Sequence, residues 1–186
     1  MMRAARLLAA LLPLAGLAGL WVHRDRHYRS GTEWEVPIMG YDPRDFLRGH
    51  YVEFSYDWPG LDLGVPGQGA QALCIEGSAP RIARVSLLKA DAACAHRLIA
   101  HPGHVYGASA LERGRLYVGQ ERAMALQQRL QQPDQRGIVT IRLREDGSFT
   151  PVSIRFRPLT QDEIAAREAQ DEGAEDMRPP PPIMAE

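Results

Sequence analysis

The chain is poor in the residues that commonly carry chemistry. It has two cysteines and no C-x-x-C pair, which excludes a dithiol redox motif and a cysteine-rich zinc site. The glycines of residues 60–69 lie among prolines and precede no helix, so they do not form a phosphate-binding loop. The acidic residues of the central region show no spacing that suggests a general acid–base pair: Asp62, Asp91, Glu112 and Glu121. We therefore expect neither an enzyme activity nor a cofactor.

The net charge is small and unevenly distributed. The formal net charge is −1, but residues 160–186 hold eight acids and two arginines and carry −6, which leaves +5 on residues 1–159. Lys89 is the only lysine among 22 basic residues. A surface that binds nucleic acid needs a dense basic patch, and here the positive charge is spread over many segments. We expect no nucleic acid partner.

The longest uncharged run lies at the N-terminus. Residues 7–22 contain no charge and are bracketed by Arg6 and Arg24. The run is slightly shorter than the ~20 residues that span a bilayer, and snorkelling arginines with an interfacial Trp21 extend it. We interpret it as an uncleaved single-pass anchor in the cell inner membrane; a signal peptide cleaved after Ala18 is the alternative. Since large downstream domains translocate largely regardless of flanking charge, we expect the main domain in the periplasm.

Cys74 and Cys94 leave two interpretations open. If the domain reaches an oxidising compartment, two cysteines at this separation can form one disulfide. Otherwise they are two small buried hydrophobic side chains. The spacing alone does not decide between a disulfide and a pair of free thiols.

Hydrophobic periodicity predicts an α+β fold, in which an N-terminal transmembrane helix precedes a compact β-rich domain with one or two helices. Alternation of period two predicts strands at 50–57, 71–76, 81–89, 113–118, 137–144 and 149–157. Helical spacing begins at Gln120 and ends before Pro133, and Thr160 with Glu163 forms a capping box that starts a second helix. Residues 90–113 match neither period. The expected divisions are an anchor at 1–24, a juxtamembrane segment at 25–40, a β-rich globular domain at 41–159, and a short helix with a disordered acidic, proline-rich tail at 160–186.

The stretch "DPRDFLRGHYVEFSYDW" at 42–58 holds the most patterned chemistry. Asp42 and Pro43 are a helix-start pair, and Gly49 ends the short turn before an alternating strand. A structural interpretation places Val52, Phe54 and Tyr56 in the core. A functional interpretation turns His50, Tyr51 and the charges of the turn toward a partner.

This stretch resembles the signature of the GDYXXLXY family. Gly49, Tyr51 and Tyr56 match the motif, Phe54 replaces its leucine, and His50 stands where the family has aspartate, which puts any carboxylate role there in doubt. The resemblance implies a membrane-associated protein of uncharacterised function, from a family whose members are often encoded beside multipass membrane proteins; a multipass membrane protein is therefore the partner we consider. It makes one set of residues the candidate motif site: Asp42, Pro43, Arg44, Asp45, Gly49, His50, Tyr51, Phe54 and Tyr56.

The histidines of "HRLIAHPGH" form a second candidate site. His96, His101 and His104 offer imidazoles for a metal, but their spacing matches no standard zinc pattern. The main functional hypothesis is therefore a non-enzymatic accessory protein, attached to the membrane through residues 7–22, that binds an integral membrane protein. The competing hypothesis is an extracytoplasmic enzyme or small-ligand or metal-binding domain that uses the 42–56 turn and the histidine loop.

Overall fold

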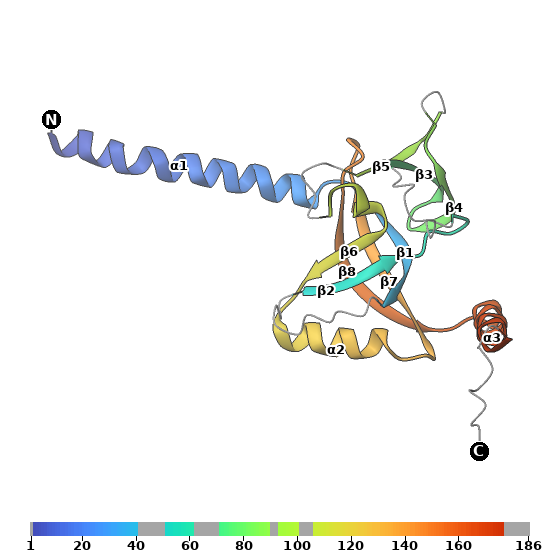
Figure 1. Ribbon diagram of the computed structural model, residues 1–186. Coiled ribbons are helices and arrows are strands. Elements are labelled where there is room, and N and C mark those ends of the chain that lie inside the picture. Colours follow the sequence, from blue (N-terminus) through green and yellow to red (C-terminus); the bar gives the residue numbers. More distant parts are fainter. Residues whose placement is uncertain (1, 41–50, 62–70, 90–92, 101–105, 177–186) are drawn as a thin grey trace, which may run out of the picture.

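The computed structural model describes residues 2–40, 51–61, 71–89, 93–100 and 106–176, with side chains described from Leu11 on except at 40, 108 and 170–176. Within these ranges the chain is an α+β protein with three α-helices and a curled, mixed sheet of eight strands (Figure 1). The elements in chain order are α1 (Met2–Arg29), β1 (Thr32–Gly40), β2 (Tyr51–Tyr56), β3 (Ala72–Ser78), β4 (Arg81–Leu87), β5 (His96–Ile99), the 3-10 helix η1 (Gly107–Leu111), β6 (Arg113–Tyr117), α2 (Gln120–Leu130), β7 (Gln135–Leu143), β8 (Phe149–Pro158) and α3 (Gln161–Asp176).

The sheet is organised around β1. One edge of β1 pairs antiparallel with β7 from Thr32 to Ile38, and its other edge pairs with β4 at Glu35 and with β2 from Ile38 to Gly40. The path β5-β3-β4-β1-β2-β6 therefore crosses β1, while β7 and β8 extend from its opposite edge. The backbone N–H of Ile99 in β5 donates to the carbonyl of Gly147 in the β7–β8 turn at 2.9 Å, so the curled sheet brings β5 to this hairpin.

The second half of the expected juxtamembrane segment at 25–40 forms β1, which pairs with three other strands of the sheet. Trp34, Val36 and Ile38 are 0, 0 and 1% exposed and alternate with polar or turn-prone residues on the other face. That outer face carries Glu33 and Glu35, whose carboxylates pair with arginines of β7 and β8. The two glutamates give the segment the composition of a solvent-exposed stretch, although Trp34, Val36 and Ile38 lie in the core.

Most other expected elements are confirmed, with boundaries that shift by a few residues. Tyr51–Tyr56 alternates between half-buried and buried side chains as a strand with one core face should. The capping box forms: Glu163 accepts from the backbone N–H of Thr160 at 2.9 Å, and Thr160 Oγ1 accepts from that of Glu163 at 3.4 Å. The unassigned region 90–113 contributes β5 and η1. The expected short turn between Pro43 and Gly49 lies outside the described residues.

The core lies between the concave face of the sheet and the elements that cover it. Its buried members include Trp34, Phe54 and Trp58, and Trp58 Nε1 donates to the carbonyl of Leu111 in η1 at 2.6 Å. α2 packs over β1, β2 and β7. Gly114 of β6 is required by this packing, because a Cβ there would lie 2.3 Å from Cε2 of Phe54.

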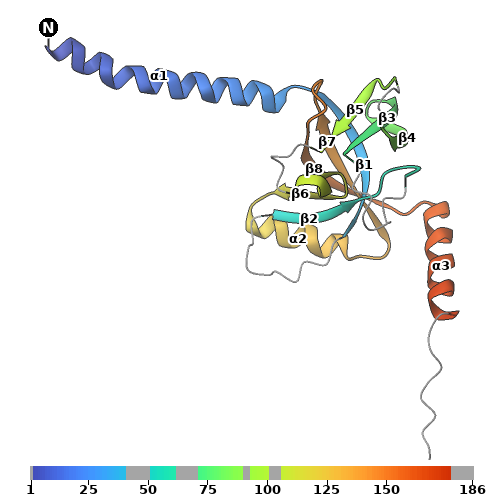
Figure 2. The same ribbon diagram turned by 45° about the horizontal axis from the view of Figure 1, so that its top comes forward.

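α1 projects away from the sheet in both views (Figures 1 and 2). Its last turn is held by the domain, since Arg142 Nη1 donates to the carbonyl of Tyr28 and Arg144 Nε to that of His27, each at 2.9 Å. These guanidinium groups satisfy carbonyls that have no partner within the helix and complement the negative end of its dipole. Gly31 then turns the chain into β1 with φ +112°, and a Cβ there would meet the carbonyl oxygen of Leu143 at 2.4 Å.

The expected transmembrane helix is only partly reproduced. The helix forms, and residues 11–22 are exposed. Among the helical residues whose side chains are described, no stretch is sufficiently long and apolar to cross a membrane. Residues 7–10 of the expected anchor lie outside this set.

Candidate functional site

β2 divides the family-like motif between two environments. Phe54 and Tyr56 are 0 and 6% exposed, and the ring of Tyr56 stacks on Trp58 at 4.9 Å and meets Phe54 edge-on at 5.4 Å. Burial, with a smaller contribution from Tyr106, raises the pKa of the Tyr56 hydroxyl, so the phenol stays protonated. This half of the motif packs the core, as the structural interpretation predicts.

The outer face of β2 carries a compact polar cluster, which we call the tyrosine–arginine cluster: Tyr51, Glu53, Tyr106, Arg115 and Tyr117. The register of β2 and β6 sets Tyr51 opposite Tyr117 and Glu53 opposite Arg115. The loop before η1 adds Tyr106, whose hydroxyl donates to Glu53 Oε1 and accepts from Arg115 Nε at 3.1 Å. Residues that are distant along the chain thus meet on one side of the sheet.

Stacking completes the tyrosine–arginine cluster. The Arg115 guanidinium carbon lies 3.8 Å from the ring centroid of Tyr51, and the ring of Tyr117 meets that of Tyr51 edge-on at 6.0 Å. Tyr117 is 63% exposed. Burial and the hydrogen bond to Glu53 raise the pKa of Tyr106, which makes its phenol a poor proton donor in acid–base chemistry. The cluster presents tyrosine and arginine side chains, the residue types that contribute most to binding energy at protein interfaces.

The other predicted site residues divide into those that are described and those that are not. Asp42, Pro43, Arg44, Asp45, Gly49 and His50 lie outside the described residues, as do His101 and His104. His96 is described, and its ring packs 4.9 Å from that of Trp34. In the described part of the chain, no three His, Cys, Asp or Glu side chains converge in a way that could hold a metal ion.

Cys74 and Cys94 form a disulfide, with their Cα atoms 5.8 Å apart. The bond links β3 to the residues that precede β5, next to the ladder in which Cys74 lies opposite Arg97. Of the two interpretations of the cysteines, the disulfide is therefore confirmed. Disulfides persist in oxidising compartments, so this bond points to an extracytoplasmic location.

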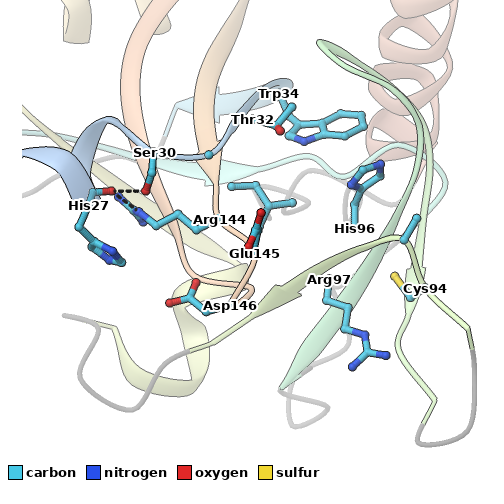
Figure 3. Close-up of a pocket in the computed structure, with 13 residues that line it drawn as sticks. His27, Ser30, Thr32, Trp34, Cys94, His96, Arg97, Arg144, Glu145 and Asp146 are labelled. Atoms are coloured by element: carbon cyan, nitrogen blue, oxygen red, sulfur yellow. Dashed lines mark hydrogen bonds between the residues drawn. The ribbon is translucent and has the colours of Figure 1, made fainter.

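A pocket of about 990 Å³ lies beside the disulfide, where the end of α1, the start of β5 and the β7–β8 turn meet (Figure 3). It is lined by His27, Ser30, Gly31, Thr32, Trp34, Cys94, Ala95, His96, Arg97, Leu143, Arg144, Glu145 and Asp146. The guanidinium of Arg144 is already hydrogen-bonded within the protein, because it also donates to Ser148 Oγ at 3.3 Å and to Thr150 Oγ1 at 3.0 Å. Sequence reasoning named only Cys94 and His96 of this group, since the pocket joins segments more than 100 residues apart.

Sequence reasoning also missed most of the tyrosine–arginine cluster. Tyr51 was a candidate through the motif, while Glu53 and Tyr117 stand in stretches whose alternation signalled the outer faces of two strands. No comparable signal marks Tyr106, which reaches the cluster from a region without periodicity.

Comparison with known proteins gives a family and no function. No curated protein and no solved structure matches the chain. The family model for the GDYXXLXY protein matches residues 13–154, which include α1 from Pro13 on and all strands but the last residues of β8. The matched region therefore covers the motif strand, the disulfide and the tyrosine–arginine cluster. The chain belongs to the GDYXXLXY family.

Proposed function

We propose that this protein is a membrane-anchored, extracytoplasmic accessory protein without enzyme activity, which binds an integral membrane protein. The anchor is α1 around residues 7–22, and the binding surface is the tyrosine–arginine cluster. Family membership is consistent with this role and assigns no reaction. The proposal is carried by the surface of α1.

The apolar side chains of α1 cover its whole circumference. At 100° per residue, the seven large hydrophobic residues between 11 and 22 spread around the helix axis, and each is between 39 and 72% exposed: Leu11, Leu12, Leu14, Leu17, Leu20, Trp21 and Val22. A helix that is hydrophobic on all sides is stable when it is surrounded by apolar material. Full burial of one such side chain contributes about 1.5–3 kcal/mol. Lipid surrounds a projecting helix completely, whereas a single protein groove covers only one side.

The disulfide supports a location of the domain outside the cytoplasm. In a reducing cytoplasm the two thiols would stay free, and β5 would lose its covalent link to β3. The domain then stands close to the membrane, because only residues 23–31 separate the apolar part of α1 from β1. A partner that lies in the same membrane is within reach of the tyrosine–arginine cluster.

The tyrosine–arginine cluster is suited to protein contact because its side chains are already ordered. Hydrogen bonds fix Tyr106 between Glu53 and Arg115, and the stacked guanidinium fixes the ring of Tyr51. Binding a pre-ordered surface avoids the ~0.5–1.5 kcal/mol that each immobilised flexible side chain costs. Tyr117 at the edge of this surface is the side chain we expect to contribute most.

The test is purification of the tagged full-length chain from native membranes in mild detergent. We expect the chain in the membrane fraction after alkaline washing, together with a multipass protein at fixed stoichiometry. Tyr117→Ala should weaken this association at least about 30-fold, the effect of truncating an interface hot spot worth ~2 kcal/mol. Met124→Ala is the matched control, because Met124 is similarly exposed, at 59%, on α2.

Two results would overturn the proposal. One is release of the intact full-length chain by osmotic shock without detergent, which would remove the anchor. The other is purification of the wild-type chain alone, or with a partner that Tyr117→Ala and Met124→Ala retain equally, which would remove the proposed binding surface.

A further inference from the structure

We propose that the pocket beside the disulfide binds a small zwitterion, a molecule in which an ammonium group lies a few bonds from a phosphate or carboxylate. The pocket is distinct from the tyrosine–arginine cluster, and none of its lining residues belongs to the family motif. The site itself does not depend on the proposed membrane anchor. Only the source of the ligand, a lipid headgroup or a free solute, is connected with the anchor.

The first observation is a buried donor without an acceptor. Trp34 is 0% exposed, and its Nε1–H has no hydrogen-bond partner in the described part of the chain. In Figure 3 the ring nitrogen lies on the edge of the indole that faces His96 and the other lining residues. A buried donor without a partner costs about 1–3 kcal/mol, so an oxygen acceptor that reaches it is favoured by a similar amount. Trp34 therefore selects a ligand with an exposed oxygen.

The second observation is that two side chains of opposite charge line the pocket without forming an ion pair. Arg97 from β5 and Glu145 from the β7–β8 turn both line the pocket, and neither makes an ion pair with any described residue. A ligand that carries both charges is attracted by both side chains, whereas an ion of one sign is repelled by one of them. Asp146 adds a second carboxylate on the Glu145 side.

The two observations define the ends of the ligand. Its oxyanion would accept from Trp34 Nε1–H beside His96, and its ammonium would donate to the carboxylate of Glu145. The Arg97 side chain points away from His96 (Figure 3), so its positive charge acts on the oxyanion at longer range. His96 is half-buried and packs 4.9 Å from the Trp34 ring, so it covers the indole and must shift when the ligand enters. The volume of about 990 Å³ admits such a molecule with water beside it.

Position suggests a source for the zwitterion. His27 and Ser30, which line the pocket, lie five and eight residues beyond Val22, or about 8 and 12 Å along a helical rise. If α1 is the anchor, the pocket opens at the depth of lipid headgroups. A phosphoethanolamine headgroup carries both charges within a few bonds of each other, and a free amino acid carries the same pair of charges.

The experiment follows the indole N–H resonance of Trp34 in ¹⁵N-labelled full-length protein in a nonionic detergent. The probes are phosphoethanolamine, glycine, methyl phosphate, ethylammonium and a neutral sugar. We expect a saturable shift with phosphoethanolamine or glycine, with a dissociation constant below about 1 mM, and at least tenfold weaker binding of the single-charge probes. Saturation with lipid nanodiscs that contain ethanolamine headgroups assigns the source to the bilayer, and saturation with glycine alone assigns it to free solutes.

Glu145→Gln tests the ammonium end without touching the core, because Glu145 is exposed. In this variant phosphoethanolamine should bind no better than methyl phosphate, while the binding of methyl phosphate stays unchanged. Glu121→Gln, an exposed change on α2, should leave the preference intact. The proposal is overturned if no zwitterion shifts the Trp34 resonance, if the sugar or a single-charge probe binds as well, or if Glu145→Gln keeps the preference. These readouts are independent of fractionation, so failure here is separate from failure of the membrane proposal.

Discussion

Removing the disulfide should destabilise the domain by about 3 kcal/mol. The bond closes a loop with a sequence separation of 20, and the entropy of closing such a loop in the unfolded chain corresponds to ~3.3 kcal/mol at 25 °C. A loss of this size lowers the ratio of folded to unfolded protein on the order of 100-fold and the melting temperature by roughly 10 °C. Cys74→Ala combined with Cys94→Ala is the appropriate change, because alanine introduces no hydroxyl at the buried position 74.

The assay is urea denaturation followed by tryptophan fluorescence, with amide hydrogen exchange as a local probe. β5 has four residues and pairs with β3, so its amides should lose protection first, together with the bond from Ile99 to Gly147. Wild-type protein reduced with a thiol reagent is the control and should match the double variant. The reasoning is refuted if the variant unfolds within about 0.5 kcal/mol of wild type and β5 keeps its protection.

Two further changes test the packing and the electrostatics. Gly114→Ala should lower the free energy of unfolding, measured by urea denaturation, by about 3 kcal/mol, because the new Cβ would lie 2.3 Å from the Phe54 ring. Gly119→Ala is the control and should cost less than about 1 kcal/mol, because no atom lies within 4 Å of the new Cβ. Equal losses in the two variants would contradict the packing described for Gly114. The hydrogen bonds from Arg157, at 2.6 and 2.7 Å, lower the pKa of Glu163 from 4.5 to about 2. Because the folded-state pKa is the lower one, this stabilisation is complete above pH 4.5 and is lost as the pH falls toward 2. Glu163→Gln should lower the free energy of unfolding at neutral pH by about 1 kcal/mol, after allowance for solvent screening, and should reduce the dependence of stability on pH in the acid range. Circular dichroism of the helical signal between pH 6 and pH 2 measures this dependence.

Local periodicity was sufficient to predict the strands whose two faces differ sharply. In β2, Val52, Phe54 and Tyr56 alternate with polar residues, and this pattern depends only on which side of one strand is buried. β1 was missed for the opposite reason. Its outward residues Glu33 and Glu35 look like those of a solvated segment, and the arginines that pair with them come from strands more than 100 residues away.

The candidate sites were less predictable than the strands, because they depend on which segments meet in space. The motif identified Tyr51, but Tyr106 joins the cluster from 53 residues beyond Glu53. The pocket unites the end of α1, the approach to β5 and a hairpin turn, and no spacing in the sequence connects them. The disulfide was one of two open interpretations, since the positions of the cysteines do not show whether their Cα atoms come within bonding range.

The hydrogen bonds from Arg142 and Arg144 to the last turn of α1 connect the orientation of the helix to that of the sheet. Only Ser30 and Gly31 separate α1 from β1, and Arg142 and Arg144 donate hydrogen bonds to the last turn of α1, so the helix and the sheet are joined by side chains as well as by the backbone. The 28 residues of α1 measure about 42 Å, and a rotation of the domain by roughly 10° would displace the far end by about 7 Å. A protein bound to the sheet, as we propose, would therefore change the tilt of the helix.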